Sequence, residues 1–178
     1  MTGFYDVGLI GQIATNLFNG YGYNFYRAAN QVRADDQRVR ELAGALLARA
    51  RAAISKAESD YRRGKIPPPT RANPFPDPAI VAEAQQLERI AQAIGALEGQ
   101  VRHQPVPEND RMTQRYREEL PTLERLAQKD AALVGQADML RGLVEGKSAA
   151  DILAQRGTIE EGLAAIAATL QERRLILV

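Results

Sequence analysis

The chain has 178 residues, 45% of them apolar, and a formal net charge of +1, so it suits one domain and has no overall field favouring nucleic acid. It contains no cysteine, which excludes disulfides and thiolate chemistry and favours a reducing compartment such as the cytoplasm. No run of about 18 apolar residues is present, so we expect no membrane-spanning helix.

The first 26 residues are aromatic and nearly uncharged, and we call them the N-terminal arm (residues 1–26). Apolar residues recur there at spacings of three and four between residues 4 and 18, which predicts a short amphipathic helix. Glycines weaken this helix, so we expect it to need a surface on which to dock. The arm holds seven of the ten aromatic residues: Phe4, Tyr5, Phe18, Tyr21, Tyr23, Phe25 and Tyr26.

A long helix is predicted next, from about residue 24 to residue 63, so that its main part is residues 27–63. It lacks proline and carries a heptad-spaced apolar stripe from Ala43 to Tyr61. At about 1.5 Å per residue such a helix is roughly 60 Å long, more than a compact domain of this size needs. We therefore expect part of it to project or to meet another chain.

The long helix is also basic, since residues 27–65 carry ten Lys and Arg residues against five Asp and Glu residues. Arg27, Arg33 and Arg38 follow the arm directly and are candidates for contact with an anionic surface. Asp35 and Asp36 are neighbours in sequence and point to different sides of a helix, so both are predicted to be solvated charges.

Residues 64–78 form a linker with six prolines in fifteen residues, which predicts a stiff polyproline II spacer. Within it, Phe75 is interpreted as a hydrophobic peg that pins the linker to the helices. Asp77 followed by Pro78 is a helix start signal, an N-cap residue before a proline at the first helical position.

The last segment, residues 79–178, is predicted to be a helical bundle. One helix covers residues 79–102, and another starts near Asn109 and is kinked or divided at Pro121. Leu126, Leu133, Ala137, Leu140 and Val144 then continue a heptad face.

Two capping boxes are predicted near the end of the chain. Ser148 with Asp151 opens a short helix that Gly157 stops, and Thr158 with Glu161 opens the last helix. The chain finishes in a hydrophobic tail, residues 175–178, a secondary candidate contact. The predicted fold class is all-α, an elongated bundle or coiled-coil-like assembly of four to six helices with an aromatic N-terminal helical arm.

The residue inventory gives little support for catalysis or for a cofactor. The segment 142–148 resembles a phosphate-binding loop, but it has three residues between its glycines where the motif needs four, and a predicted helix precedes it. We therefore interpret Gly146 as a helix C-terminal residue. His103 is the only histidine, so neither a metal site nor a catalytic triad is expected, and no known nucleic-acid-reading motif is present.

These observations favour a non-enzymatic structural or assembly subunit that docks through the arm onto copies of itself or onto a larger protein complex. The seven arm aromatics are its predicted partner-binding anchors, because Tyr and Phe bring large contact area with few rotors. Three alternatives remain: the aromatics complete the chain's own core, the arm and the basic helix bind a membrane surface, or the protein carries a hydrophobic small molecule.

Overall fold

The computed structural model describes residues 3–21, 32–71, 74–104 and 119–177. In this part of the chain every regular element is a helix, which confirms the predicted all-α class. The elements are η1 (Gly3–Tyr5), α1 (Val7–Tyr21), α2 (Val32–Lys65), α3 (Pro78–Arg102), α4 (Glu119–Val144), α5 (Ala149–Ala154) and α6 (Arg156–Leu177).

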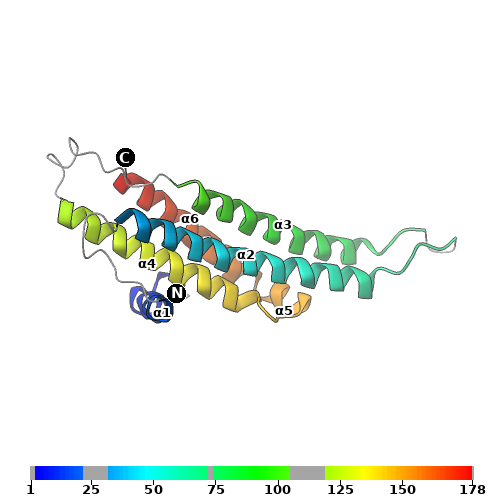
Figure 1. The fold of residues 1–178 in the computed structure, drawn as a ribbon. Coiled ribbons are helices and arrows are strands. Elements are labelled where there is room, and N and C mark those ends of the chain that lie inside the picture. The colour runs from blue at the N-terminus through cyan, green and yellow to red at the C-terminus, as the bar shows by residue number, and fades with distance from the viewer. Residues whose placement is uncertain (1–2, 22–31, 72–73, 105–118, 178) are drawn as a thin grey trace.

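Helix α2 is the centre of the bundle. It packs along α3 and α4, and α4 in turn packs along α6 (Figure 1). The predicted stripe on α2 is buried from Ala43 to Ala57, and the predicted seam of α3 is buried from Leu87 to Val101. The apolar periodicity of these helices therefore identified the core faces correctly.

The hairpin formed by α2 and α3 reaches past the ends of α4, α5 and α6 (Figure 1). At its tip, the side chain of Phe75 is 85% exposed. The interpretation of Phe75 as a peg against the bundle is therefore wrong, since no other helix of the described chain extends far enough to receive it. The predicted projection of the long helix takes the form of this hairpin.

The predicted helix boundaries are confirmed at α3 and at the end of α4. The side chain of Asp77 accepts a hydrogen bond from the amide of Ala79 at 2.8 Å, with Pro78 at the first helical position. Gly146 adopts a φ of +72°, a conformation that glycine reaches without the strain a Cβ would bring, and it lies two residues after Val144, where α4 ends.

The last two helices are divided differently from the prediction. Ser148 and Asp151 do form a capping box at the start of α5. Helix α6, however, already begins at Arg156, so Gly157 lies inside it and Thr158 is not its N-cap. The reason is that Gln155 alone separates the two helices, and its carbonyl accepts the amide of Ile159 at 3.0 Å.

Other predicted features fall partly outside the described residues. The stretches 24–31 and 109–118 lie there, so the predicted starts of two helices are not described. Pro121 lies two residues after Glu119, the first described residue of α4, so the predicted kink or break there is not tested by the described residues.

Candidate interaction surfaces

The N-terminal arm lies against its own bundle through one face. Phe4 is 1% exposed, and Ile10, Ala14 and Phe18 are also buried. Helix α1 packs on α4, and η1 contacts α6. Two of the seven predicted anchors, Phe4 and Phe18, are thus core residues of the chain itself, as the core alternative expects, and the structure leaves them no free surface for a partner.

Two glycines of the bundle make room for the arm. A Cβ placed on Gly162 in α6 would lie 2.6 Å from Cζ of Phe4, and a Cβ placed on Gly135 in α4 would lie 2.5 Å from the carbonyl oxygen of Ile10. Both distances are far below van der Waals contact, so any larger residue would displace the arm. Neither glycine interrupts its helix, and the sequence offered no signal for this role.

A buried pair of polar side chains fixes the start of the arm. The amide nitrogen Nε2 of Gln136 donates to the carbonyl oxygen of Phe4 at 3.3 Å. Thr169 donates through Oγ1 to Oε1 of Gln136 at 2.9 Å. Because these bonds are buried and link η1, α4 and α6, they specify one position for the arm on the bundle.

The opposite face of the arm is presented to solvent. Asp6 caps α1 by accepting hydrogen bonds through Oδ1 from the amides of Gly8 and Leu9, at 3.0 and 3.1 Å. Around this cap, Val7 is 86% exposed, and Tyr5 and Leu9 are exposed as well. The arm therefore carries an outer apolar face, which we define as Tyr5, Val7 and Leu9.

A cavity of about 340 Å³ lies beside this outer face, between the arm, α4 and α6. Tyr5 and Val7 line one side of it. The helices contribute small apolar residues to its walls: Ala131, Ala132, Ala165 and Ala168. Lys129 and Glu172 form an ion pair between α4 and α6 and also line the cavity.

The structure describes only some of the other predicted contact residues. Tyr21 and Arg33 lie at described backbone positions whose side chains are not described. Arg38 is exposed on α2. Three aromatics and one arginine of the prediction lie outside the described residues altogether: Tyr23, Phe25, Tyr26 and Arg27. In the C-terminal tail, Leu175 is exposed on the last turns of α6.

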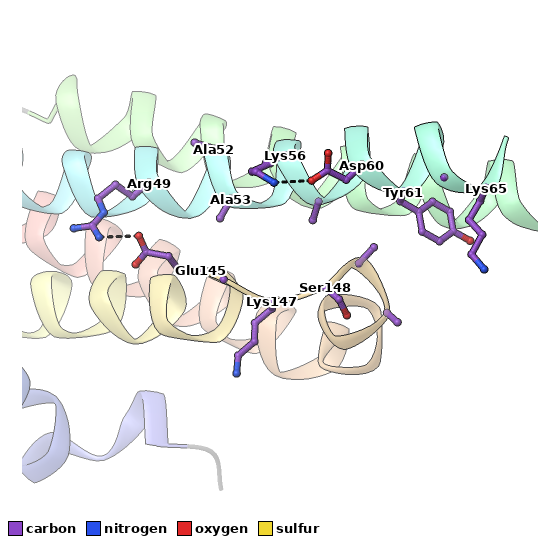
Figure 2. Close-up of a pocket in the computed structure, with 15 residues that line it drawn as sticks. Arg49, Ala52, Ala53, Lys56, Asp60, Tyr61, Lys65, Glu145, Lys147 and Ser148 are labelled. Atoms are coloured by element: carbon purple, nitrogen blue, oxygen red, sulfur yellow. Dashed lines mark hydrogen bonds and ion pairs between the residues drawn. The ribbon is translucent and has the colours of Figure 1, made fainter. Parts of the chain in front are cut away.

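A second and larger hollow, of about 870 Å³, lies between the second half of α2 and the turn leading into α5 (Figure 2). We call it the α2–α5 groove. Its apolar surface consists of small residues and one tyrosine: Ala52, Ala53, Ala57, Tyr61, Gly64, Ala149 and Ala150. Its charged residues are four cations and two anions: Arg49, Lys56, Lys65, Lys147, Asp60 and Glu145.

Both anions of the α2–α5 groove already have partners (Figure 2). Arg49 Nη2 lies 2.7 Å from Glu145 Oε1, and hydrogen bonds from Arg49 and then from Arg141 lower the pKa of Glu145. Lys56 Nζ donates to Asp60 at 2.6 Å, and this bond lowers the pKa of Asp60. Both carboxylates therefore form ion pairs with cations of the groove itself.

Tyr61 connects the α2–α5 groove to α3. Its hydroxyl donates a hydrogen bond to the carboxylate of Glu83, which raises the pKa of Tyr61. The ring is thus held at the edge of the groove with its polar end directed to the neighbouring helix. This arrangement leaves the ring available as apolar surface.

A buried ion cluster joins α2, α4 and α6. Arg173, Asp36 and Asp130 are each 0% exposed. Arg173 donates through Nε to Asp130 Oδ1 at 2.7 Å and through Nη2 to Asp36. Arg40 Nη2 lies 2.9 Å from Asp36 Oδ2. The prediction that Asp36 is a solvated charge is therefore wrong, because the packing of α6 against α2 buries it beside its counter-ion Arg173.

The sequence did contain a signal for this cluster. Asp36 precedes Val39 by three positions and Ala43 by seven, in phase with the buried stripe of α2. Arg173 likewise follows Leu170 by three positions and Ile166 by seven. Opposite charges in phase with apolar stripes on different helices indicate a buried pair more than a solvated surface.

The described residues give no sign of a metal centre or of a spanning helix. No group of three or more potential metal ligands occurs among them. Within the same ranges, no helix has both the length and the apolar character needed to cross a bilayer. The single histidine, His103, ends α3, and its Nδ1 lies 2.7 Å from the carbonyl oxygen of Gly99.

Within the described residues, the main candidate surfaces are thus the outer apolar face of the arm with its adjacent cavity and the α2–α5 groove. Comparison with protein families, with curated proteins and with solved structures found no match to this chain.

Proposed function

We propose that the protein is a non-enzymatic helical assembly subunit that pairs with a second copy of itself through the outer face of its N-terminal arm. The supporting observation is where the exposed large apolar side chains lie. Three of those in the described chain, Tyr5, Val7 and Leu9, fall within five residues, and two of them border the 340 Å³ cavity. Clustered exposed apolar residues mark interaction sites more often than scattered ones do.

The shape of this surface suits pairing of identical copies. In a two-fold interface the same patch meets itself, so each patch needs both a projection and a hollow. Here the projecting Tyr5 and Val7 stand directly beside the alanine-lined cavity. Lys129 and Glu172 line the same cavity with opposite charges, so the patch does not repel its own copy.

The anchoring of the arm supports the same proposal. The inner face is held by Phe4 and by the hydrogen bond from Gln136, so the outer face has a defined position before a partner arrives. A surface that is already ordered loses less conformational entropy on association. The arm therefore combines two roles, a core element on one side and an interface on the other.

The test is the solution mass of the whole chain measured by light scattering over a range of concentrations. We expect a dimer for the wild type and an increase of roughly tenfold or more in its dissociation constant for Tyr5→Ser with Val7→Ser. Phe75→Ser is the control, because it removes an aromatic side chain that is more exposed than Tyr5 and lies far from the arm (Figure 1). A monomeric wild type, or an equal effect of the control, would overturn the proposal.

The other hypotheses make different predictions in the same samples. Binding to a membrane surface predicts that the wild type floats with anionic liposomes and that salt weakens this flotation. Carriage of a hydrophobic molecule predicts a bound compound in native mass spectra. Neither result is expected if the outer face serves a second copy.

A further inference from the structure

We infer that the α2–α5 groove binds an amphipathic helix with acidic flanks, supplied by a different protein. This inference is independent of the self-pairing proposed above, because the arm and the groove share no lining residue. The shape, the length and the charge of the groove all favour such a partner.

The shape follows from where α4 ends. The apolar stripe of α2 is covered by α4 along its buried middle, but α4 stops at Val144 and α5 has only six residues. Beyond that point the stripe continues through Ala57 and Tyr61 to Gly64, which line the groove. The groove is thus a helix-packing surface that continues where its covering helix ends.

The residues along this surface suit the close approach of a helix. Ala53, Ala57 and Tyr61 follow one another at four-residue spacing, the row that forms a ridge on a helix surface. Alanines in such a row leave room for larger side chains of a partner helix, such as leucine. From Arg49 to Lys65 the groove follows α2 for about 24 Å at 1.5 Å per residue, so it accommodates a helix of about four turns.

The charge of the groove indicates which charged residues a partner helix should carry beside its apolar stripe. Its two carboxylates are already engaged by Arg49 and Lys56. Lys65 extends from the end of α2, and Lys147 stands at the outer edge on the α4–α5 turn (Figure 2). Lys65 forms no ion pair with a described residue, whereas the pKa of Asp151 in α5 is lowered first by the hydrogen bonds from Ser148 and then by the nearby charge of Lys147. The groove is lined by four cations and two anions, and this excess of positive charge around its apolar surface favours a helix that carries Asp or Glu beside its apolar stripe.

Binding is tested by fluorescence anisotropy with designed, fluorescein-labelled peptides of about 18 residues, long enough for the groove. The first peptide has a leucine stripe flanked by glutamates. The second replaces every glutamate with lysine, and the third replaces every leucine with serine. We expect the first peptide to bind and the other two to bind at least roughly tenfold more weakly.

The site is tested with exposed residues whose replacement leaves the core intact. Lys65→Glu with Lys147→Glu should weaken binding of the acidic peptide by roughly tenfold or more. Arg89→Glu with Arg125→Glu is the matched control, because both arginines are exposed, lie outside the groove and undergo the same change of charge. The control pair should bind within about twofold of the wild type if the effect belongs to the groove and is not global.

Three outcomes would overturn the inference. The acidic and basic peptides could bind equally, or the control pair could lose as much affinity as the groove pair. The groove variants could also change the mass of the protein in the absence of peptide, which would show that a second copy occupies the groove. A failure of the arm variants to change the mass would leave this inference standing, so the two proposals fail separately.

Discussion

Arg173 is the largest fully buried side chain in the described part of the chain, and two carboxylates enclose it. Removing a charge from water is expensive, and the attraction between opposite charges offsets that cost only when the geometry is good. Replacing Arg173 removes a counter-ion from two buried carboxylates at once, although Asp36 keeps its ion pair with Arg40. Arg173 is therefore the position where a single substitution has the largest expected effect.

Arg173→Met keeps most of the side-chain volume but leaves Asp36 and Asp130 without their shared counter-ion. We expect the free energy of unfolding to fall by about 3–5 kcal/mol, measured by chemical denaturation. Arg174→Met removes an exposed arginine at the next position and should change this free energy by less than about 0.5 kcal/mol. Equal effects of the two substitutions would contradict the role of the buried cluster.

At the scale of elements, the capping box of α5 links stability to pH. The hydroxyl and backbone amide of Ser148 lower the pKa of Asp151 in the folded chain. A lowered folded-state pKa means that the stabilisation is present above the unfolded pKa and is lost as the pH falls through the folded one. Removal of the Ser148 hydroxyl should therefore remove part of this pH dependence.

Ser148→Ala should raise the pKa of Asp151 toward its ordinary value, as measured by NMR titration of the carboxyl carbon. Loss of a serine N-cap typically lowers stability by about 1 kcal/mol. Thr158→Ala is the control, because Thr158 lies within α6 and caps no helix. If Thr158→Ala destabilised the chain as much as Ser148→Ala, the boundary between α5 and α6 would be wrong.

The docking of the arm makes a prediction for α6. In Gly162→Ala the new methyl group would overlap the ring of Phe4, so the arm should loosen and its amides should exchange hydrogen faster. Gly157→Ala lies in the same helix with open space around its Cβ position and should leave exchange in the arm unchanged. Unchanged exchange in Gly162→Ala would show that the contact between Phe4 and Gly162 does not hold the arm in place.

For the whole molecule, the sequence predicted what depends on local periodicity. The stripes of α2, α3 and α4 were found because residues three and four apart share one helix face, whatever surrounds them. The division of the arm into an inner and an outer face was not predicted. It depends on Gly135 and Gly162, which meet Ile10 and Phe4 across more than a hundred residues of chain.

The α2–α5 groove was not predicted for a similar reason. It exists because α4 ends beside the middle of α2. A sequence does not show how far one helix is shifted along the bundle axis relative to its neighbour. Its charged residues on α2 were noted only as part of a basic helix, and Glu145 and Lys147 only as part of the segment that resembles a phosphate-binding loop. The burial of Asp36 and Arg173 could have been predicted, since both residues are in phase with apolar stripes. Their pairing could not, because it depends on which helices are neighbours.

The same cluster has a consequence for the order in which the chain is completed. Arg173 follows Asp36 by 137 residues and Asp130 by 43. A ribosome therefore releases both carboxylates well before it releases the guanidinium that neutralises them. Closing α2 onto α4 in the meantime would bury Asp36 and Asp130 without the guanidinium that pairs with both of them, and Arg40 would pair with Asp36 alone, which is unfavourable. Arrival of α6 thus supplies the cation that stabilises the buried contact between α2 and α4, so we expect this contact to form fully only after α6 is made.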